Sequence, residues 1–364
     1  MSTQQLPGRG TGLEPVNRFD GIQVLRGDLD QEREGRIESG LEPDPPSPST
    51  TFYRDSARTI LSENASPDIG FRYSVNPYRG CEHGCIYCYA RPSHERLDFN
   101  AGIDFESRIV VKEDAPHLLR KALARPKWEP QTVALSGNTD CYQPIERQLR
   151  ITRRCLEVFA EFRNPVAIIT KSALVARDAD LLAALARRRA AEVRISITTL
   201  DPAIARRMEP RAASPERRLE AIRRLADAGV PTAVMVAPVV PGLTDEELPR
   251  ILDAAAAAGA RSASWILVRL PHPVEELFVD WLGRNFPDRR DRVVRRIQQT
   301  RGGTGRLSDS TFGRRMRGQG EYARQLAALF AAGARRSGLD RPLPPLDPSS
   351  FRRPLAADRQ LALL

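Results

Sequence analysis

The chain has 364 residues, of which 28% are charged and 41% hydrophobic, and its formal net charge is +10. This length is sufficient for one large domain or two smaller ones with buried cores. Five unevenly placed cysteines do not form a disulfide framework, no apolar run reaches the roughly 18–20 residues of a membrane span, and no secretory signal opens the chain. We therefore expect a cytoplasmic protein without a membrane segment, and we exclude coiled coils and repeat arrays.

The sequence divides into three regions. Residues 1–50 have little apolar periodicity and end in a Pro-rich stretch, which is typical of a flexible arm, although GIQVLRG (21–27) has the composition of an edge strand. Residues 51–270 form the predicted core. Residues 271–364 are predicted to be basic and mostly helical, with an extended Pro-rich tail.

Short β-branched runs alternate with Ala-, Arg- and Leu-rich segments of helical period in the core. Strands are predicted at 71–76, 132–137, 166–171, 193–199, 232–238 and 264–270, with helices at 145–162, 178–190, 214–228 and 244–259, followed by helical segments at 274–300 and 319–337. This alternation implies right-handed βαβ units and a parallel sheet. Nearly continuous apolar strands fit a sheet covered on both faces or closed into a barrel, and six strands favour a partial barrel over a full eight-unit one. In either case ligands bind at the C-terminal ends of the strands.

Local signals mark several helix ends. Ser214 is a predicted N-cap, because a proline follows it at the first helical position. Thr244 and Glu247 have the spacing of a capping box. Gly229 and Gly259 stand where a helix end favours a left-handed residue.

Three cysteines occur together in the loop after the first predicted strand. Cys81, Cys85 and Cys88 have the spacing C-x3-C-x2-C, and Gly80 and Gly84 allow the backbone to wrap around a common centre. Thiolates suit zinc or an iron–sulfur cluster. A closed zinc site requires four protein ligands, whereas a four-iron cluster with three cysteine ligands keeps one iron open to another molecule. A Cys3His zinc site with His83 or His94 is an alternative, as is a set of cysteines without a metal.

This cysteine spacing after a first strand, with an aromatic residue just before the last cysteine, resembles the radical S-adenosylmethionine (SAM) superfamily. The resemblance implies that Cys81, Cys85 and Cys88 each hold one iron of a [4Fe–4S] cluster and that SAM binds the fourth iron. It implies reductive cleavage of SAM to methionine and a 5′-deoxyadenosyl radical, which abstracts a hydrogen atom from the substrate. It also implies a (β/α)6 partial TIM barrel and an external electron donor of the flavodoxin or ferredoxin type.

Further segments resemble the spore photoproduct lyase-related, or DNA-repair-photolyase-like, branch of this superfamily. They are SGNTDCYQPIE (136–146), IITKSAL (168–174), SITTLD (196–201), MEPRAASPERRLEAIRRLADAGVP (208–231) and VAPVVPGLTD (236–245). The resemblance covers roughly residues 70–270.

The branch resemblance also suggests a SAM-binding set. Tyr87 would hold the adenine through its backbone, and Thr139 and Asp140 correspond to a SAM-contacting segment. Lys171 would meet the SAM carboxylate, and Ser196 would contact the sugar or the methionine part. The last four of these residues lie at or near predicted strand ends, where a strand-end cation or a capping hydroxyl is the simpler interpretation.

The spore lyase returns a hydrogen atom from a cysteine, and the aligned position here is Gly137. Cys141, four residues later, is a tentative hydrogen donor in its place, or a small packing residue. Cys155 falls on the apolar face of a predicted helix, and we interpret it as a core residue.

The positive charge is concentrated near the C-terminus, because residues 261–364 hold 20 basic and 10 acidic residues. An Arg- and Gly-rich segment, 301–317, is a candidate nucleic-acid contact, with a solvated basic surface as the alternative. Its basic residues are Arg301, Arg306, Arg314, Arg315 and Arg317, and Phe312 lies among them.

The last five residues, Gln360–Leu364, resemble a sliding-clamp docking peptide, although the final Phe of that peptide is missing. The overall prediction is a radical SAM enzyme whose substrate is a DNA lesion or a nucleic-acid base. The alternatives are radical modification of a protein, peptide or small molecule, and a non-catalytic zinc-binding nucleic-acid module.

Overall fold

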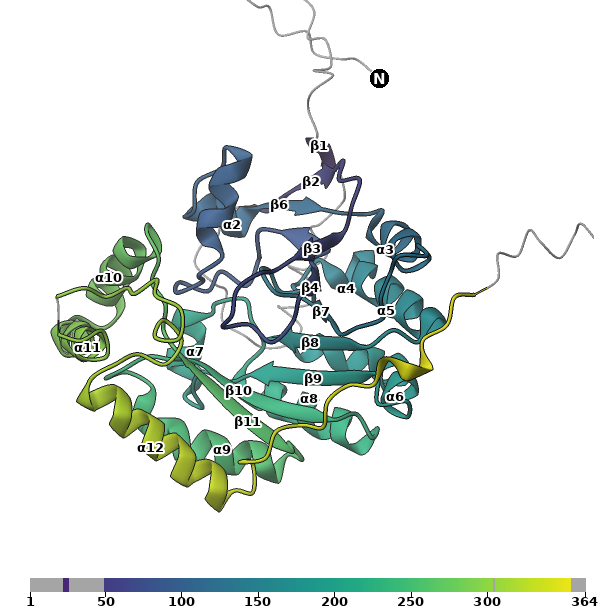
Figure 1. The fold of residues 1–364 in the computed structure, drawn as a ribbon. Helices are drawn as coiled ribbons and strands as arrows, with labels where there is room; N and C mark the ends of the chain where they lie inside the picture. The colour runs from purple at the N-terminus through teal and green to yellow at the C-terminus, as the bar shows by residue number, and fades with distance from the viewer. Residues whose placement is uncertain (1–21, 26–48, 304, 355–364) are drawn as a thin grey trace, which may run out of the picture.

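The computed structural model describes residues 22–25, for which only the backbone is described, together with 49–303 and 305–354. Most of the predicted flexible arm, residues 1–50, and all of the docking peptide Gln360–Leu364 lie outside the described residues. The described chain forms a curved seven-stranded sheet with helices around its outer side and a four-stranded sheet beside it (Figure 1).

The large sheet has the strand order β11-β10-β9-β8-β7-β4-β3. Its strands are β3 (Leu61–Glu63), β4 (Tyr73–Val75), β7 (Val133–Leu135), β8 (Val166–Thr170), β9 (Ala191–Ser196), β10 (Thr232–Val239) and β11 (Ser262–Leu267). All pairs from β4 to β11 are parallel, and β3 pairs antiparallel with β4 at one edge. The predicted mixed α/β fold with a parallel sheet is confirmed, and each predicted strand segment overlaps one of the parallel strands.

Helices follow most of these strands. They are η1 (Arg91–Leu97), α2 (Ile103–Ser107), α3 (Ala115–Leu123), α4 (Glu146–Leu149), α5 (Ile151–Phe162), η2 (Ala173–Asp178), α6 (Ala179–Ala186), α7 (Pro202–Met208), α8 (Pro215–Asp227), η3 (Asp245–Glu247), α9 (Leu248–Ala257), α10 (Val274–Asn285), α11 (Pro287–Gln299), α12 (Glu321–Arg336) and η4 (Pro348–Ser350). The helix predicted at 145–162 is divided by Arg150, whose φ is 50°. In Figure 1, α5, α6, α8 and α9 surround the outer side of the sheet, and α12 packs beside α9.

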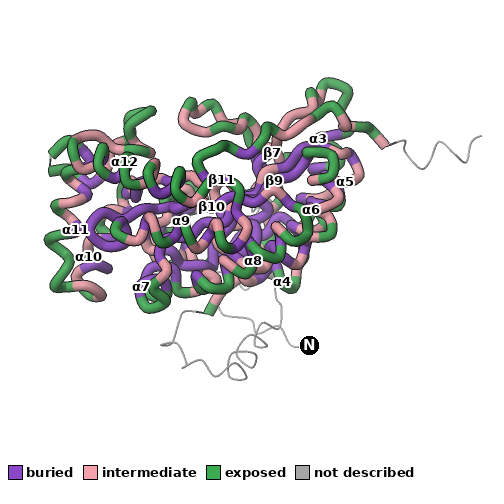
Figure 2. The backbone as a smooth tube through the Cα atoms, turned by 90° about the horizontal axis from the view of Figure 1, so that it is seen from below, coloured by how far each residue is buried: buried purple, intermediate pink, exposed green. Residues whose placement is uncertain are grey.

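The two faces of the large sheet differ in chemistry. Direct neighbours across four strands form an apolar, buried row on the helix side: Val75, Leu135, Ile168 and Val193. The neighbours one residue earlier form a row on the opposite, inner side: Ser74, Ala134, Ala167 and Glu192. These four strands are therefore apolar on the helix side and lined by small or polar residues on the inner side. Figure 2 shows the strands as a buried centre under an exposed outer shell of helices.

A smaller sheet, which the sequence did not predict, has the order β1-β2-β6-β5. It consists of β1 (Ile22–Leu25), β2 (Thr51–Asp55), β5 (Tyr78–Arg79) and β6 (Arg108–Val111). The edge-strand interpretation of residues 21–27 is confirmed, because β1 pairs antiparallel with β2 at the outer edge of this sheet. Its strand β5 lies between β4 and the cysteine loop in the sequence.

One of the two helix-start predictions is confirmed. The Ser214 side chain accepts a hydrogen bond from the N–H of Arg217 at 3.4 Å, as an N-cap does. The capping box is wrong, because the Thr244 hydroxyl accepts instead from the N–H of Val240 at 3.1 Å. The Glu247 carboxylate reaches the loop after β9 and accepts from the N–H of Leu200 at 2.8 Å. Gly229 and Gly259 have φ of 79° and 98°, as predicted.

The C-terminal region covers the open edge of β11. The N–H of Leu267 donates to the carbonyl of Met316, and the N–H of Ala263 donates to that of Leu339, each at 3.0 Å. From residue 338 the tail is extended and crosses the ends of α6 and α5, where Asp347 and Arg352 donate from their backbone. Figure 1 shows this segment in yellow. These bonds satisfy the edge groups of β11 that would otherwise be open to pairing.

No helix in the described part of the chain is long and apolar enough to cross a membrane.

Candidate active site

The three cysteines lie in a loop that leaves the smaller sheet. The short strand β5 stands between β4 and Cys81, whereas the sequence placed the cysteines directly after the first strand. Gly80 and Gly84 have φ of 76° and 64°. A Cβ on Gly80 would lie 2.9 Å from the carbonyl oxygen of Phe105, so this position requires glycine for space as well as for conformation.

Gln143 holds the backbone on both sides of Cys81. Its side-chain oxygen accepts from the N–H of Glu82 at 2.9 Å, and its amide donates to the carbonyl of Gly80 at 3.3 Å. Gln143 is fully buried and stands in the loop after β7. A single side chain therefore couples the first cysteine to the end of β7.

Arg91 holds the second part of the loop in the same way. Its buried guanidinium donates to the carbonyls of Gly84 and Cys85, at 3.3 and 3.1 Å, and to that of Gly102 at 2.8 Å. Glu106 lies 3.5 Å away as its carboxylate partner. The loop is thus fixed by two buried side chains that the sequence analysis did not single out.

The three thiols are close enough to influence one another electrostatically. Burial raises the pKa of Cys81 and Cys88, and it raises that of Cys85 to about 12. Lys171 opposes this effect at Cys85 and Cys88, and the backbone of Asp140 opposes it at Cys81. A thiolate is therefore unfavourable here unless an added positive charge, such as that of iron, stabilises it.

The two histidines near the loop are engaged elsewhere. His83 Nδ1 lies 3.5 Å from an Asp140 carboxylate oxygen, and burial lowers the pKa of His83. His94 Nε2 lies 2.9 Å from the carbonyl oxygen of Arg108, and its ring packs against Phe99 and Phe105. In the described chain no group of three or more His, Cys, Asp or Glu residues could hold a single metal ion. The Cys3His zinc alternative is therefore not supported.

A buried charged pair lies beside the cysteine loop. Glu209 and Arg218 form an ion pair whose side chains are each 1% exposed. The carboxylate of Glu209 also accepts from the hydroxyls of Tyr87 and Thr198, the latter at 2.6 Å. Arg218 donates further to the carbonyl of Ser196 at 3.0 Å. The sequence segment 208–231 suggested a family but no role for either charged residue.

Lys171 follows β8 and reaches into the centre of the site. Its Nζ donates to the carbonyl of Ala237 at 3.1 Å and lies 5.7 Å from the centre of the Tyr87 ring. Its positive charge lowers the pKa of Cys85 and of Cys88, against the larger effect of burial. The structure thus brings Lys171, Tyr87 and the cysteine loop together, as the sequence predicted.

Thr139 and Asp140 are occupied by contacts within the protein. The Thr139 hydroxyl donates to the carbonyl of Tyr78 at 2.8 Å. Asp140 accepts from the Thr170 hydroxyl and from the N–H of Lys171, each at 2.7 Å. Both residues therefore connect the ends of β7 and β8 to the cysteine loop. These bonds give both residues a positioning role, and the SAM contact that the resemblance implies for them stays a prediction.

Ser196 lies at the end of β9, on the inner face beside Met235, and is 3% exposed. Its carbonyl oxygen accepts a hydrogen bond from Arg218 at 3.0 Å.

A family model for the radical SAM superfamily matches residues 75–255, a span that contains the cysteine loop, Lys171, Ser196 and the Glu209–Arg218 pair. The chain belongs to the radical SAM superfamily. Membership implies a [4Fe–4S] cluster and SAM as its cofactors and identifies the protein as an enzyme.

Relatives of this radical SAM protein come from bacteria, an archaeon and viruses. An uncharacterized protein of Mycobacterium tuberculosis is 40% identical over 242 residues, which cover 65% of this chain and 71% of the relative. The radical SAM Nalpha-GlyT isomerase of Pseudomonas phage M6 is 24% identical over 58% of this chain and 42% of its own length. Among solved structures, spore photoproduct lyase complexed with dinucleoside spore photoproduct has a similar fold, with a TM-score of 0.55 and 17% identity over 84% of this chain and 91% of that one.

The cysteine loop fits the cluster that superfamily membership implies. Cys81, Cys85 and Cys88 supply thiols alone, and both neighbouring histidines have other partners. Each thiolate of a four-iron cluster binds a different iron, so the three sulfur atoms do not need to converge on one point as they would around zinc. Three ligands would leave one iron for SAM, and Lys171 would supply a positive charge to the site.

Replacement of Gln143 by leucine is expected to weaken cluster retention. The change leaves the N–H of Glu82 and the carbonyl of Gly80 buried without this partner, so Cys81 is held less firmly. We expect iron loss to a chelator to be about tenfold faster, which a colorimetric iron assay follows over time. Gln148→Leu, on an exposed position five residues later, should match wild type. Equal rates for both variants would contradict the role of Gln143.

Cys141 points away from the inner face. It is fully buried among apolar residues on the helix side, and its Sγ lies 3.9 Å from the carbonyl oxygen of Leu135. Burial raises the pKa of this thiol well above its ordinary value. The position matches a packing residue and does not support the hydrogen-donor prediction. Cys155 is a buried core residue of α5, as expected.

The Arg-rich segment is less available for a ligand than its sequence predicts. Arg301 is buried and donates to the carbonyl of Val268 at 2.6 Å. Arg315 forms an ion pair with Asp68 at 2.6 Å. Arg306, Arg314 and Arg317 are exposed. Two of the five arginines therefore serve the fold, and three remain on the surface.

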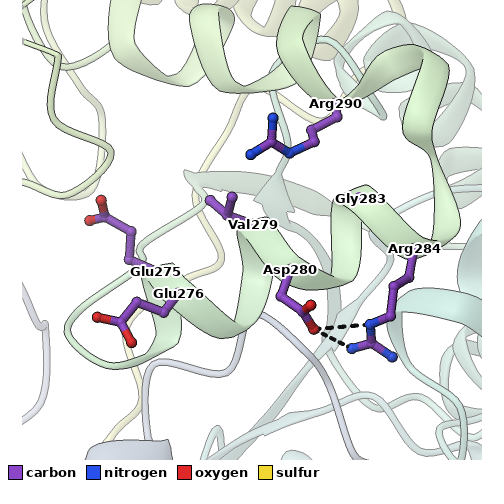
Figure 3. A pocket seen from close by; sticks show the side chains of 7 residues that line it. All are labelled: Glu275, Glu276, Val279, Asp280, Gly283, Arg284 and Arg290. Carbon is purple, nitrogen blue, oxygen red and sulfur yellow. Dashed lines mark hydrogen bonds and ion pairs between the residues drawn. The ribbon is translucent and has the colours of Figure 1, made fainter.

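A surface hollow lies between α10 and α11, and none of the residues that line it belongs to the cysteine site (Figure 3). It is open and lined by Glu275, Glu276, Val279, Asp280, Gly283, Arg284 and Arg290. Asp280 and Arg284 form an ion pair across one side of it. Because no residue of the site lines this hollow, we assign it no part in the chemistry.

Proposed function

We propose that this radical SAM enzyme abstracts a hydrogen atom from a base or base lesion in nucleic acid. The radical chemistry is supported by the loop of three thiols, which Gly80 and Gly84 allow to turn, together with Lys171. When bound and reduced, the cluster would supply the one electron that cleaves SAM to methionine and a 5′-deoxyadenosyl radical. Cys81, Cys85 and Cys88 would each hold one iron, and an external electron donor would reduce the cluster.

The other residues would bind and orient SAM. Lys171 would hold the SAM carboxylate near the thiols, and the backbone of Tyr87 would contact the adenine. Ser196 would contact the sugar or methionine part from the end of β9. Thr139 and Asp140 would hold the loop after β7 in place against Tyr78 and the end of β8. The Tyr87 side chain would stay fixed through Glu209, which accepts a hydrogen bond from its hydroxyl.

Nucleic acid is favoured as the substrate because the fold resembles that of a lyase solved with a dinucleoside photoproduct. We further propose that the six parallel strands act as the (β/α)6 partial barrel, with 51–270 as the core and 271–364 as a basic region near the substrate. A reducing cytoplasm would suit its free cysteines. The remaining candidate substrates are proteins, peptides and small molecules; nothing in the comparisons favours a sliding clamp as a partner.

Isotope transfer tests the substrate class. The reduced enzyme and SAM are incubated with nucleic acid, protein or small-molecule fractions from bacteria grown in heavy water, and the mass of 5′-deoxyadenosine is measured. We expect deuterium in 5′-deoxyadenosine from the nucleic-acid fraction, including DNA that has been irradiated. Deuterium from the protein or small-molecule fraction alone would contradict the proposal.

A further inference from the structure

Two aromatic rings are exposed in the described chain, and one of them adjoins the cysteine loop. In the described chain, only four large hydrophobic side chains are exposed, and the aromatic ones are Tyr89 at 48% and Phe312 at 55%. Tyr89 follows Cys88 directly, and Phe312 lies in the Arg-rich segment. Exposure of a large aromatic ring costs hydrophobic free energy, so both rings are candidates for contact with a ligand.

An arginine covers one face of each ring. The guanidinium carbon of Arg269 lies 5.2 Å from the centre of the Tyr89 ring. That of Arg315 lies 4.4 Å from the centre of the Phe312 ring. Cation–π contact orients each ring, and about half of each aromatic side chain stays exposed. The chain therefore presents two similar pairs, each with an aromatic ring and a guanidinium.

The two pairs belong to one continuous rim. Arg269 lies two residues after the end of β11 and contacts the sulfur of Met316 at 3.8 Å, while Arg315 precedes that methionine. Arg269 and Arg315 are near enough for each to act on the charge of the other. We call Tyr89, Arg269, Phe312 and Arg315 the aromatic rim.

The aromatic rim is fixed at both ends. The Tyr89 hydroxyl donates to the carbonyl of Gly137, at the end of β7. Asp68 binds Arg315 at 2.6 Å and accepts from the N–H of Gly313 at 2.7 Å. Both rings are therefore held in place before any ligand binds, which lowers the entropy cost of stacking.

Arg269 gives the rim an uncompensated positive charge. In the described part of the chain no carboxylate lies within ion-pair distance of it, and partial burial lowers its pKa. Asp68, whose negative charge acts on Arg269, is bound to Arg315. A guanidinium in this position attracts an anion such as a phosphate group.

We propose that the aromatic rim is a stacking platform for unpaired bases of single-stranded nucleic acid, with Arg269 on the backbone phosphate. The inference rests on the proposed nucleic-acid substrate and extends it, since it selects a single-stranded or extruded base over paired duplex. Every nucleobase has a face that stacks on an aromatic ring, and a basic groove beside it follows the phosphates. The rim begins one residue after Cys88, so a base stacked on Tyr89 would lie next to the radical source.

Fluorescence anisotropy with the full-length, reconstituted protein tests this platform without reductant or SAM. The probes are a fluorescein-labelled 12-nucleotide single-stranded DNA, its RNA counterpart, its duplex, and an abasic 12-mer with the same phosphates. We expect Phe312→Ala to weaken binding to the base-bearing single strands roughly tenfold and to leave binding to the abasic strand unchanged. Phe312→Trp should retain wild-type affinity, and Leu329→Ala, another exposed hydrophobic position, serves as the control.

A change in salt dependence tests the phosphate contact. Arg269→Gln should lower the slope of log affinity against log salt by about one, whereas Phe312→Ala should leave the slope as it is. Equal affinity of wild type and Phe312→Ala for the base-bearing strand would overturn the platform, as would equal weakening on the abasic strand or tighter binding to the duplex. Full competition by polyglutamate would point to an acidic protein partner instead and would also overturn it. Isotope transfer decides the proposed function separately, because it depends on SAM cleavage and these titrations do not.

Discussion

Replacement of Cys85 by alanine is expected to abolish the iron–sulfur cluster. The variant has two loop thiols, whereas the wild-type protein has three. The two histidines near the loop, His83 and His94, have other partners and cannot replace the missing ligand. Anaerobic reconstitution of wild type should give a brown protein with about four irons per chain, whereas Cys85→Ala should remain almost colourless. Iron and sulfide assays, together with the visible absorption spectrum, measure this difference.

Two other cysteines provide matched controls for this loss. Cys155→Ala removes a thiol from the core of α5, and Cys141→Ala removes one from the helix side of β7. Both variants should bind as much iron as wild type, although each loses some stability through the cavity it creates. A normal cluster in Cys85→Ala, or its loss in Cys155→Ala, would contradict the assignment of the three loop cysteines.

Removal of the Glu209 carboxylate is expected to have the largest effect on stability. Glu209→Ala leaves the guanidinium of Arg218 buried without its partner, which costs about 3–5 kcal/mol of unfolding free energy. Denaturant titration measures this loss. Glu220→Ala, which breaks the exposed pair with Arg223, should change little. Equal stability of Glu209→Ala and wild type would show that the pair is not important for the fold.

The same carboxylate predicts a dependence on acid pH. Burial alone would raise the pKa of Glu209, but Arg218 and Lys171, together with hydrogen bonds from Thr198 and Tyr87, lower it to about 2 from an ordinary value of 4.5. Its ionised form therefore contributes stability that is fully present above pH 4.5 and is lost as the pH falls toward 2, by roughly 3 kcal/mol in all. Glu209→Gln lacks this contribution. The stability difference between wild type and Glu209→Gln should shrink over this interval, and a constant difference would contradict the lowered pKa.

The main sheet could be predicted because its strands carry a strong local signal. Each parallel strand is a short β-branched run between helical segments, so periodicity alone locates it. The smaller sheet lacks such a signal, since β5 has two residues and β2 and β6 pair across more than fifty residues of chain. Periodicity also failed to separate the two faces of the sheet, because small residues such as Ala134 and Ala167 count as apolar in sequence yet line the inner side.

The cysteine loop was predictable for a different reason. Its ligands are close together in sequence, and their spacing carries the chemistry directly. Glu209 and Arg218 are far from the loop in sequence, and only the fold places them beside Tyr87. Their common segment held an acidic residue and an arginine nine positions apart, which is a weak signal without the burial that the structure provides.

Strand-end position predicted where these residues lie but not which contacts they make within the protein. Lys171 and Asp140 both lie near the thiols, as their positions predicted. Asp140 is nevertheless fully engaged with Thr170 and the backbone of Lys171, which no sequence pattern reveals. The Arg-rich segment gives the same lesson, because charge alone did not distinguish the buried Arg301 from exposed Arg306.

Formation of 5′-deoxyadenosine from SAM tests the central claim most directly. Wild type and Cys85→Ala are reconstituted anaerobically, reduced with dithionite, mixed with SAM and analysed by liquid chromatography with mass detection. Because the three loop cysteines are assigned to the cluster that cleaves SAM, wild type should form 5′-deoxyadenosine and methionine, and Cys85→Ala should form neither. A wild-type protein that holds a four-iron cluster but forms no 5′-deoxyadenosine, or a Cys85→Ala variant that forms as much as wild type, would contradict this assignment.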